Sequence, residues 1–142
     1  MSVPLAATDP RGGRLSVAGK LRLSAEILAT YCRVRWWLAR KDLPEVVEII
    51  RSRERLAEET VTPWNGLRLG AAVVRLMSLL PTDSRCLMRS LVLLTLLERR
   101  SVTATLVIGV KPAPSFGAHA WVERDGRPLL PAGDEFGRLV AI

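Results

Sequence analysis

The sequence predicts an α+β fold, with N-terminal helices followed by a small antiparallel sheet. Apolar residues recur at helical spacing in four segments before Arg100. Beyond that residue the chain changes to short runs rich in Val, Thr and Ile that are separated by Gly and Pro. Helices that come first and antiparallel strands that come afterward are typical of the α+β class.

The predicted helices have recognisable starts and stops. They are expected at residues 21–40, from Pro44 through Ile50, at 67–80 and at 86–100. Pro63 and Gly66 interrupt the helical pattern between the second and third helices, and Pro81 ends the third. Thr82, Asp83 and Ser84 are good N-cap residues, so the fourth helix is expected to begin just after them.

The strands are expected at residues 102–110, 118–124, 127–130 and 139–142. The dipeptide Asp125-Gly126 lies between the second and third of these runs and is the favoured signal of a two-residue type I′ hairpin. A turn of that length pairs Arg124 with Arg127. The same register, continued along the strand, pairs His119 with Ala132.

Charge and hydropathy bear on the partners and the compartment. The net charge is +7, but arginines and acids are mixed along residues 51–59, which is typical of a solvated helical face. We therefore expect no nucleic-acid partner, and an acidic protein or peptide is at least as good an explanation. The longest apolar run, residues 91–97, is far shorter than the roughly 20 residues of a membrane helix. Two dissimilar cysteines without a secretory signal favour the reducing cytoplasm.

Cys86 is the candidate nucleophile. It follows the predicted N-cap residues within one turn, and a helix N-terminus supplies unpaired N–H groups and partial positive charge that favour a thiolate. A free cysteine at this position is, on position alone, more often a small buried hydrophobe. Cys32 lies in the middle of the first helix, where only that structural interpretation applies.

His119 is the only histidine of the chain, so any imidazole-dependent chemistry must use it. Strand alternation places it on one face with Trp121 and Glu123. We expect these two residues at the edge of a substrate site. Two cysteines and one histidine without CxxC or HExxH spacing do not predict a metal site.

Three segments carry a resemblance to a known family. They read RCLMRSL at 85–91, IGV at 108–110 and FGAHAWVE at 116–123. The order of a helix-borne cysteine, a strand histidine and a later acid resembles the papain-like and transglutaminase-like superfamily. Within it, the segments resemble the leader peptidases of lasso-peptide biosynthesis, the B2 proteins. The resemblance covers about residues 67–142.

The resemblance implies a cysteine peptidase that removes the leader from a ribosomally made lasso precursor, with Cys86 as nucleophile and His119 as general base. It implies no cofactor. The partners would be the precursor peptide, a lasso cyclase and a separate PqqD-like leader-recognition protein. We expect a flexible tail at 1–17, a helical region at 18–66 and a transglutaminase-like catalytic core at 67–142, within one compact domain.

The third catalytic residue is where the sequence departs from the resembled family, in which an aspartate follows the histidine by about a dozen residues. The hairpin register places Asp134 diagonally beside His119, at about 7 to 8 Å between backbones. Asp125 lies about 20 Å from His119 along the strand, and Glu123 about 13 Å. Asp134 is therefore the predicted orienting acid, and Asp125 is a turn residue.

Two other functions stay open. A transglutaminase-like acyltransferase would use the same Cys86 and His119 but would transfer the acyl group to an amine. A non-catalytic module would use the basic, aromatic stretch at residues 33–41 to bind a peptide, a nucleic acid or a membrane surface. In that stretch Trp37 is expected in the core, with the arginines as its solvated rim.

Overall fold

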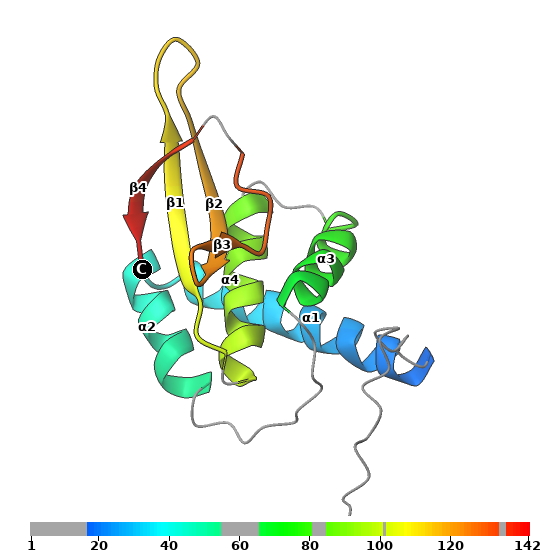
Figure 1. Ribbon diagram of the computed structural model, residues 1–142. Coiled ribbons are helices and arrows are strands. Elements are labelled where there is room, and N and C mark those ends of the chain that lie inside the picture. The colour runs from blue at the N-terminus through cyan, green and yellow to red at the C-terminus, as the bar shows by residue number, and fades with distance from the viewer. Residues whose placement is uncertain (1–16, 55–65, 81–84, 101, 134–135) are drawn as a thin grey trace, which may run out of the picture.

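The computed structural model describes residues 17–54, 66–80, 85–100, 102–133 and 136–142, and it has the predicted α+β architecture (Figure 1). The helices are α1 (Val17–Leu38), α2 (Leu43–Glu54), α3 (Gly66–Met77) and α4 (Arg85–Arg99). The strands are β1 (Thr105–Lys111), β2 (Gly117–Arg124), β3 (Arg127–Pro128) and β4 (Gly137–Ala141). The tail predicted for 1–17 lies outside the described residues, except that Val17 already belongs to α1. The cap residues predicted at 82–84 and the breaks at Pro63 and Pro81 also lie outside them.

The sheet is antiparallel with the strand order β3-β2-β1-β4. Arg124 pairs with Arg127, so the predicted hairpin register is confirmed. Asp125 and Gly126 have φ values of 52° and 75°, and two successive positive φ values are the mark of a type I′ turn. Asp125 is therefore a turn residue, as predicted.

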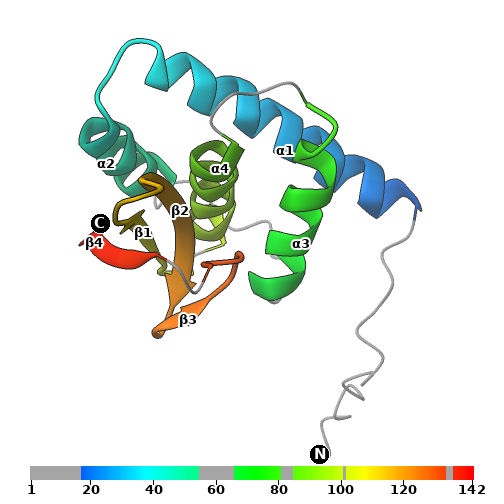
Figure 2. The ribbon, with the colours of Figure 1, turned by 90° about the horizontal axis from the view of Figure 1, so that it is seen from above.

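Helix α4 lies at the centre of the molecule. Seen from above, α2 and α3 flank it on opposite sides, α1 runs along a third side and the sheet covers the remaining side (Figure 2). Residues 91–97 of α4 are fully buried on every face of the helix. Thr95 satisfies its hydroxyl inside this core by donating to the Leu91 carbonyl at 2.8 Å. Residues 91–97, the longest apolar run of the sequence, thus form the axis of the hydrophobic core.

Helix α1 buries one narrow face. Ile27, Tyr31, Val34 and Trp37 are buried, and the core position of Trp37 is confirmed. Leu21 and Leu28 are exposed. Cys32 is exposed as well, which corrects its interpretation as a buried hydrophobe. The buried positions follow one another at three- and four-residue steps, and these three residues lie off that stripe.

Arginine side chains link the first two helices to the C-terminal end of α4 and to the chain that follows it. Arg100 binds Glu26 of α1 in a bidentate pair at 3.0 and 3.1 Å. Arg51 of α2 donates to the Ala104 carbonyl at 3.1 Å and lies 3.6 Å from the buried carboxylate of Glu98. Charges of both signs are therefore neutralised where the helices meet, as partly buried ionic groups require.

None of the helices in the described ranges combines the length and the apolarity that a bilayer crossing needs.

Candidate active site

Cys86 is the second residue of α4 and lies in its first turn, where it is half-buried and forms no disulfide. The first four N–H groups of an α-helix have no partner within the helix, and they make its N-terminus favourable for negative charge. The side chain of Ser90, one turn later, donates to the Cys86 carbonyl at 2.7 Å. The buried part of α4 thus fixes the backbone that carries the thiol.

His119 lies in the first half of β2 and is half-buried. Its Nε2 is 2.6 Å from the carbonyl oxygen of Pro131. A carbonyl oxygen can only accept, so Nε2 carries the hydrogen and Nδ1 of the neutral ring is left with a free lone pair. The ring also contacts Trp121 and Phe136, with centroids 5.8 and 5.2 Å apart. Three neighbours therefore fix the tautomer and the orientation of the imidazole.

Cys86 and His119 line one small cavity of about 80 Å³. Its walls come from α3, α4, β2 and the segment after β3. The other lining residues are Val74, Arg89, Ala120, Leu130 and Pro131. A thiol at a helix N-terminus and an imidazole with a free Nδ1 are thus brought together from segments more than thirty residues apart.

The segment after β3 does not continue the hairpin as predicted. Its ladder with β2 has only the pairs at Arg127 and Pro128, and one further bond joins the Leu129 N–H to the Val122 carbonyl at 2.8 Å. The prediction that the strand extends to Leu130 is therefore wrong. The pairing of His119 with Ala132, from which Asp134 was derived, is not part of the ladder. Asp134 itself lies outside the described residues, and its role stays a prediction.

Gly70 of α3 explains how the chain after β3 is held near the site. A Cβ at this position would lie 2.5 Å from the Leu129 carbonyl oxygen, far inside van der Waals contact. The absence of a side chain lets the backbone of Leu129 approach the helix. Leu130 is buried beside it, and the next residue is Pro131, which binds His119.

Trp121 and Glu123 share the face of β2 that carries His119, but both are buried. The Trp121 indole donates to a Glu123 carboxylate oxygen at 2.8 Å, and the other oxygen pairs with Arg138 at 3.0 Å. The indole also packs on Gly109 of β1, where a Cβ would lie 2.7 Å from the ring. These contacts give both residues a packing role; their contact with substrate stays a prediction.

Two groups in the cavity escaped the sequence analysis. Arg89 follows Cys86 by three residues, and this helical spacing is a signal that would have placed it on the same face. The Pro131 carbonyl leaves no such signal, because a backbone group is present at every position. Only the path of the chain after β3 brings it to His119.

Metal ligands do not gather in the described part of the chain. Among those residues, no three His, Cys, Asp or Glu side chains come close enough to hold an ion. A metal-free and cofactor-free mechanism stays a prediction.

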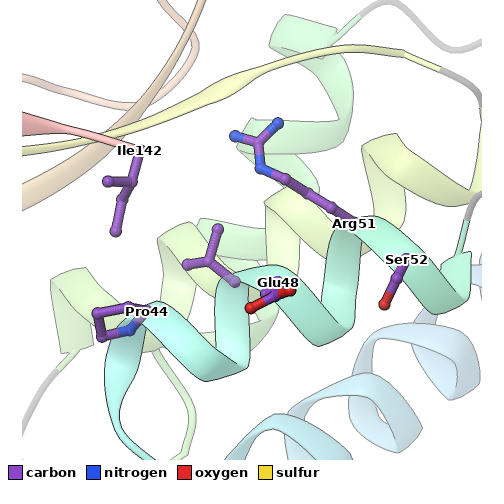
Figure 3. Close-up of a pocket in the computed structure, with 6 residues that line it drawn as sticks. Pro44, Glu48, Arg51, Ser52 and Ile142 are labelled. Atoms are coloured by element: carbon purple, nitrogen blue, oxygen red, sulfur yellow. The ribbon is translucent and has the colours of Figure 1, made fainter.

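A larger hollow of about 360 Å³ lies between α2 and the C-terminal residue Ile142 (Figure 3). Pro44, Val47, Glu48, Arg51 and Ser52 form its remaining walls. None of these residues is a cysteine or a histidine, and acyl chemistry of the kind considered for Cys86 has no nucleophile–base pair there.

Comparison with known proteins finds a match to a family model. No curated protein and no solved structure matches the chain. A family model described as the Transglutaminase-like superfamily matches residues 26–140, a range that begins in α1 and includes both Cys86 and His119. Because this match spans most of its length, the chain belongs to the transglutaminase-like superfamily.

Proposed function

We propose that this protein is a cysteine peptidase that removes the leader from a ribosomally synthesised lasso-peptide precursor. The observation that carries the proposal is the shared cavity of Cys86 and His119, in which the Pro131 carbonyl holds the Nε2 hydrogen. Members of the superfamily usually work through a cysteine, and the residues around Cys86 and His119 resemble those of leader peptidases. The cytoplasm is the expected compartment, since the nucleophile is a free thiol.

The first half-reaction forms an acyl-enzyme. Nδ1 of His119 takes the thiol proton, and the Cys86 sulfur attacks the scissile carbonyl carbon to form a C–S bond. The tetrahedral oxyanion is stabilised by unpaired N–H groups in the first turn of α4, of which the Cys86 N–H is the candidate donor. The protonated imidazole gives its proton to the leaving amine, and the C–N bond breaks.

The second half-reaction releases the leader. Water loses a proton to His119 and attacks the thioester carbonyl, and the C–S bond breaks as the thiolate takes the proton back. No redox change or cofactor is needed. The hydrogen bond to Pro131 stabilises one ring orientation through both steps, and Asp134 is proposed to support the positive imidazolium.

Acyl transfer to an amine is the second candidate, and the superfamily match favours it. Such an enzyme would share the first half-reaction and would differ only in the group that attacks the thioester. Incubation with the precursor and a primary amine separates the two functions by mass spectrometry. A free leader carboxylate is expected, and a leader that carries the amine would identify an acyltransferase.

A separate leader-recognition protein is proposed to dock on α1. An exposed stripe, here called the α1 stripe, follows this helix at three- and four-residue steps. It consists of Leu21, Ala25, Leu28, Cys32 and Trp36. The Arg40 guanidinium covers the Trp36 ring at 4.4 Å, and exposed arginines and aromatics are common interface anchors. The basic residues of the stretch at 33–41 beside the stripe favour a partner with an acidic face. The cyclase would then receive the core peptide.

Cleavage of the full-length precursor, with and without the recognition protein, tests both parts of the proposal. The partner is expected to lower KM more than it changes kcat, because tethering raises the local substrate concentration. Trp36→Ala should remove this benefit and leave cleavage without the partner unchanged. Equal kcat/KM with and without the partner would show that leader recognition resides in this chain.

A further inference from the structure

Arg89 is the one charged side chain that lines the cavity of Cys86 and His119 in the described residues. Its side chain is half-buried, and its Nε is buried without a hydrogen-bond partner. A buried N–H of a cation that makes no hydrogen bond is costly, and native proteins rarely keep one unless a ligand or a function uses it. The mechanism proposed above does not use it.

Arg100 provides a contrast within the same helix region. Its Nε is also buried without a partner, but its terminal nitrogens bind Glu26 and the Leu96 carbonyl. That guanidinium is therefore neutralised by a carboxylate. The Arg89 guanidinium has no comparable carboxylate among the described residues, and it borders a cavity rather than a helix–helix contact.

The position of Arg89 determines what it can bind. It follows Cys86 by three residues on α4, so the two side chains lie on one face about one turn apart. The cavity of about 80 Å³ is far smaller than the several hundred Å³ typical of a site for a drug-sized ligand. A group held by the guanidinium must therefore be small and must lie next to the sulfur. A carboxylate matches a guanidinium best, because the two can form parallel charge-assisted hydrogen bonds.

We propose that Arg89 binds a carboxylate of the substrate beside the scissile carbonyl. The inference rests on the proposed function and specifies its substrate class: peptides with an Asp or Glu side chain next to the scissile bond. Arg89 is then a specificity-determining residue, and the bound carboxylate would neutralise a guanidinium that has no carboxylate partner among the described residues. A single charge-assisted interaction of this kind corresponds to roughly a ten-fold preference or more over the neutral amide.

Alkylation of Cys86 tests this inference without any peptide substrate. In both reactions the thiolate sulfur attacks the methylene carbon, a C–S bond forms, the C–I bond breaks and iodide leaves. Iodoacetate carries a carboxylate, whereas iodoacetamide is its neutral counterpart of nearly equal size. The ratio of their rates cancels the thiolate fraction and reports the charge environment beside the sulfur. Cys32→Ala removes the second, exposed thiol, and alkaline pH keeps imidazole groups uncharged.

The expected result is a rate ratio that favours iodoacetate and that falls about ten-fold in Arg89→Gln. Arg85→Gln is the matched control, since Arg85 carries the same charge one residue before Cys86 but is exposed. Its ratio should change less than two-fold, because solvent screens an exposed charge. Equal ratios in the parent and in Arg89→Gln, or an equal loss in Arg85→Gln, would overturn the inference.

Two further measurements keep the inference testable. If Arg89→Gln does not fold, as judged by circular dichroism, the ratio in the parent protein is measured against salt concentration. The preference for iodoacetate should fall as salt rises, and a ratio independent of salt would count against a cation at the sulfur. If the precursor is not cleaved but the alkylation ratio depends on Arg89 as expected, the proposed function alone is rejected. If the precursor is cleaved but the alkylation ratio does not depend on Arg89 or on salt, only the role of Arg89 is rejected.

Discussion

Two hollows in the described part of the chain differ in opposite ways: the one at α2 has the larger volume, and the one at α4 has the more reactive side chains. The hollow at α2 is the larger, but its arginine, Arg51, is occupied by the Ala104 carbonyl and the Glu98 carboxylate. The small cavity at α4 holds a thiol, an imidazole and Arg89, whose Nε is buried without a partner. The arginine of the larger hollow is paired within the fold, and the arginine of the small cavity is the one for which we propose a ligand. The two hollows are therefore better distinguished by whether their arginine has a carboxylate partner than by their volumes.

Cys86→Ala gives the largest effect expected in the small cavity. Leader cleavage should fall on the order of a thousand-fold or more, because only water attack on an unactivated amide remains. The thermal midpoint should hardly change, since the side chain is small and half-buried. Cys32→Ala is the control and should be nearly silent in activity. Retained cleavage by the Cys86→Ala protein, followed by mass spectrometry, would remove the basis of the mechanism.

His119→Ala ranks next, with a loss of about a hundred-fold to ten-thousand-fold in kcat, the usual contribution of a general base. Asp134→Asn should slow cleavage less, because an orienting carboxylate acts on position and charge rather than on the proton transfer itself. Asp125→Asn should change little, since Asp125 is an exposed turn residue. If Asp125→Asn were inactive and Asp134→Asn normal, the predicted acid would be the wrong one.

The Pro131 carbonyl can be weakened without changing any side chain of the cavity. Replacing Ala132 by lactic acid turns the Pro131–Ala132 amide into an ester, whose carbonyl is a poorer acceptor. We expect kcat to fall about ten-fold, which corresponds to the loss of one hydrogen bond. The matched control is the same replacement of Ala113 in the Pro112–Ala113 bond of an exposed loop. An equal loss at both positions would exclude a specific role for the Pro131 carbonyl.

Gly70→Ala tests whether the approach of α3 holds the histidine side of the site. The added methyl group would meet the Leu129 carbonyl and should cost about 1–3 kcal/mol in the free energy of unfolding. Displacement of Leu129 should also shift Pro131 and lower kcat several-fold. Gly137→Ala is the control, because its nearest contact would be an ordinary 3.9 Å. If the folded Gly70→Ala protein kept the activity of the parent protein, α3 would have no role in positioning His119.

Arg51→Ala addresses the larger hollow and should have the smallest effect on activity. It removes a partner of the buried Glu98 and a hydrogen bond to the Ala104 carbonyl, so the free energy of unfolding should fall by about 1–2 kcal/mol. The activity per folded molecule should stay as in the parent protein. Urea unfolding and cleavage assays on the same samples measure both. A loss of activity without a loss of stability would contradict the distinction between the two hollows.

The sequence predicted those parts of the fold that local chemistry determines. The four helices follow from apolar spacing, and the hairpin at Asp125-Gly126 follows from a turn that accepts two positive φ values. The length of β3 could not be predicted in this way, because it depends on tertiary contacts. Leu130 packs in the core and the Leu129 carbonyl lies against Gly70 of α3, so the chain leaves the sheet after Pro128. The same holds for the Pro131 carbonyl, which the sequence does not distinguish from any other.

The two proposed catalytic side chains are held by segments of unequal stability. Cys86 begins a helix whose residues 91–97 form the axis of the core, so the backbone amides of that buried stretch should exchange with deuterium as slowly as the global unfolding allows. His119 is oriented by Pro131, which follows a ladder of only two residue pairs. On heating, the imidazole should lose its fixed orientation before the thiol loses its helix. Inactivation is then expected to precede unfolding, while the rate of simple thiol alkylation persists.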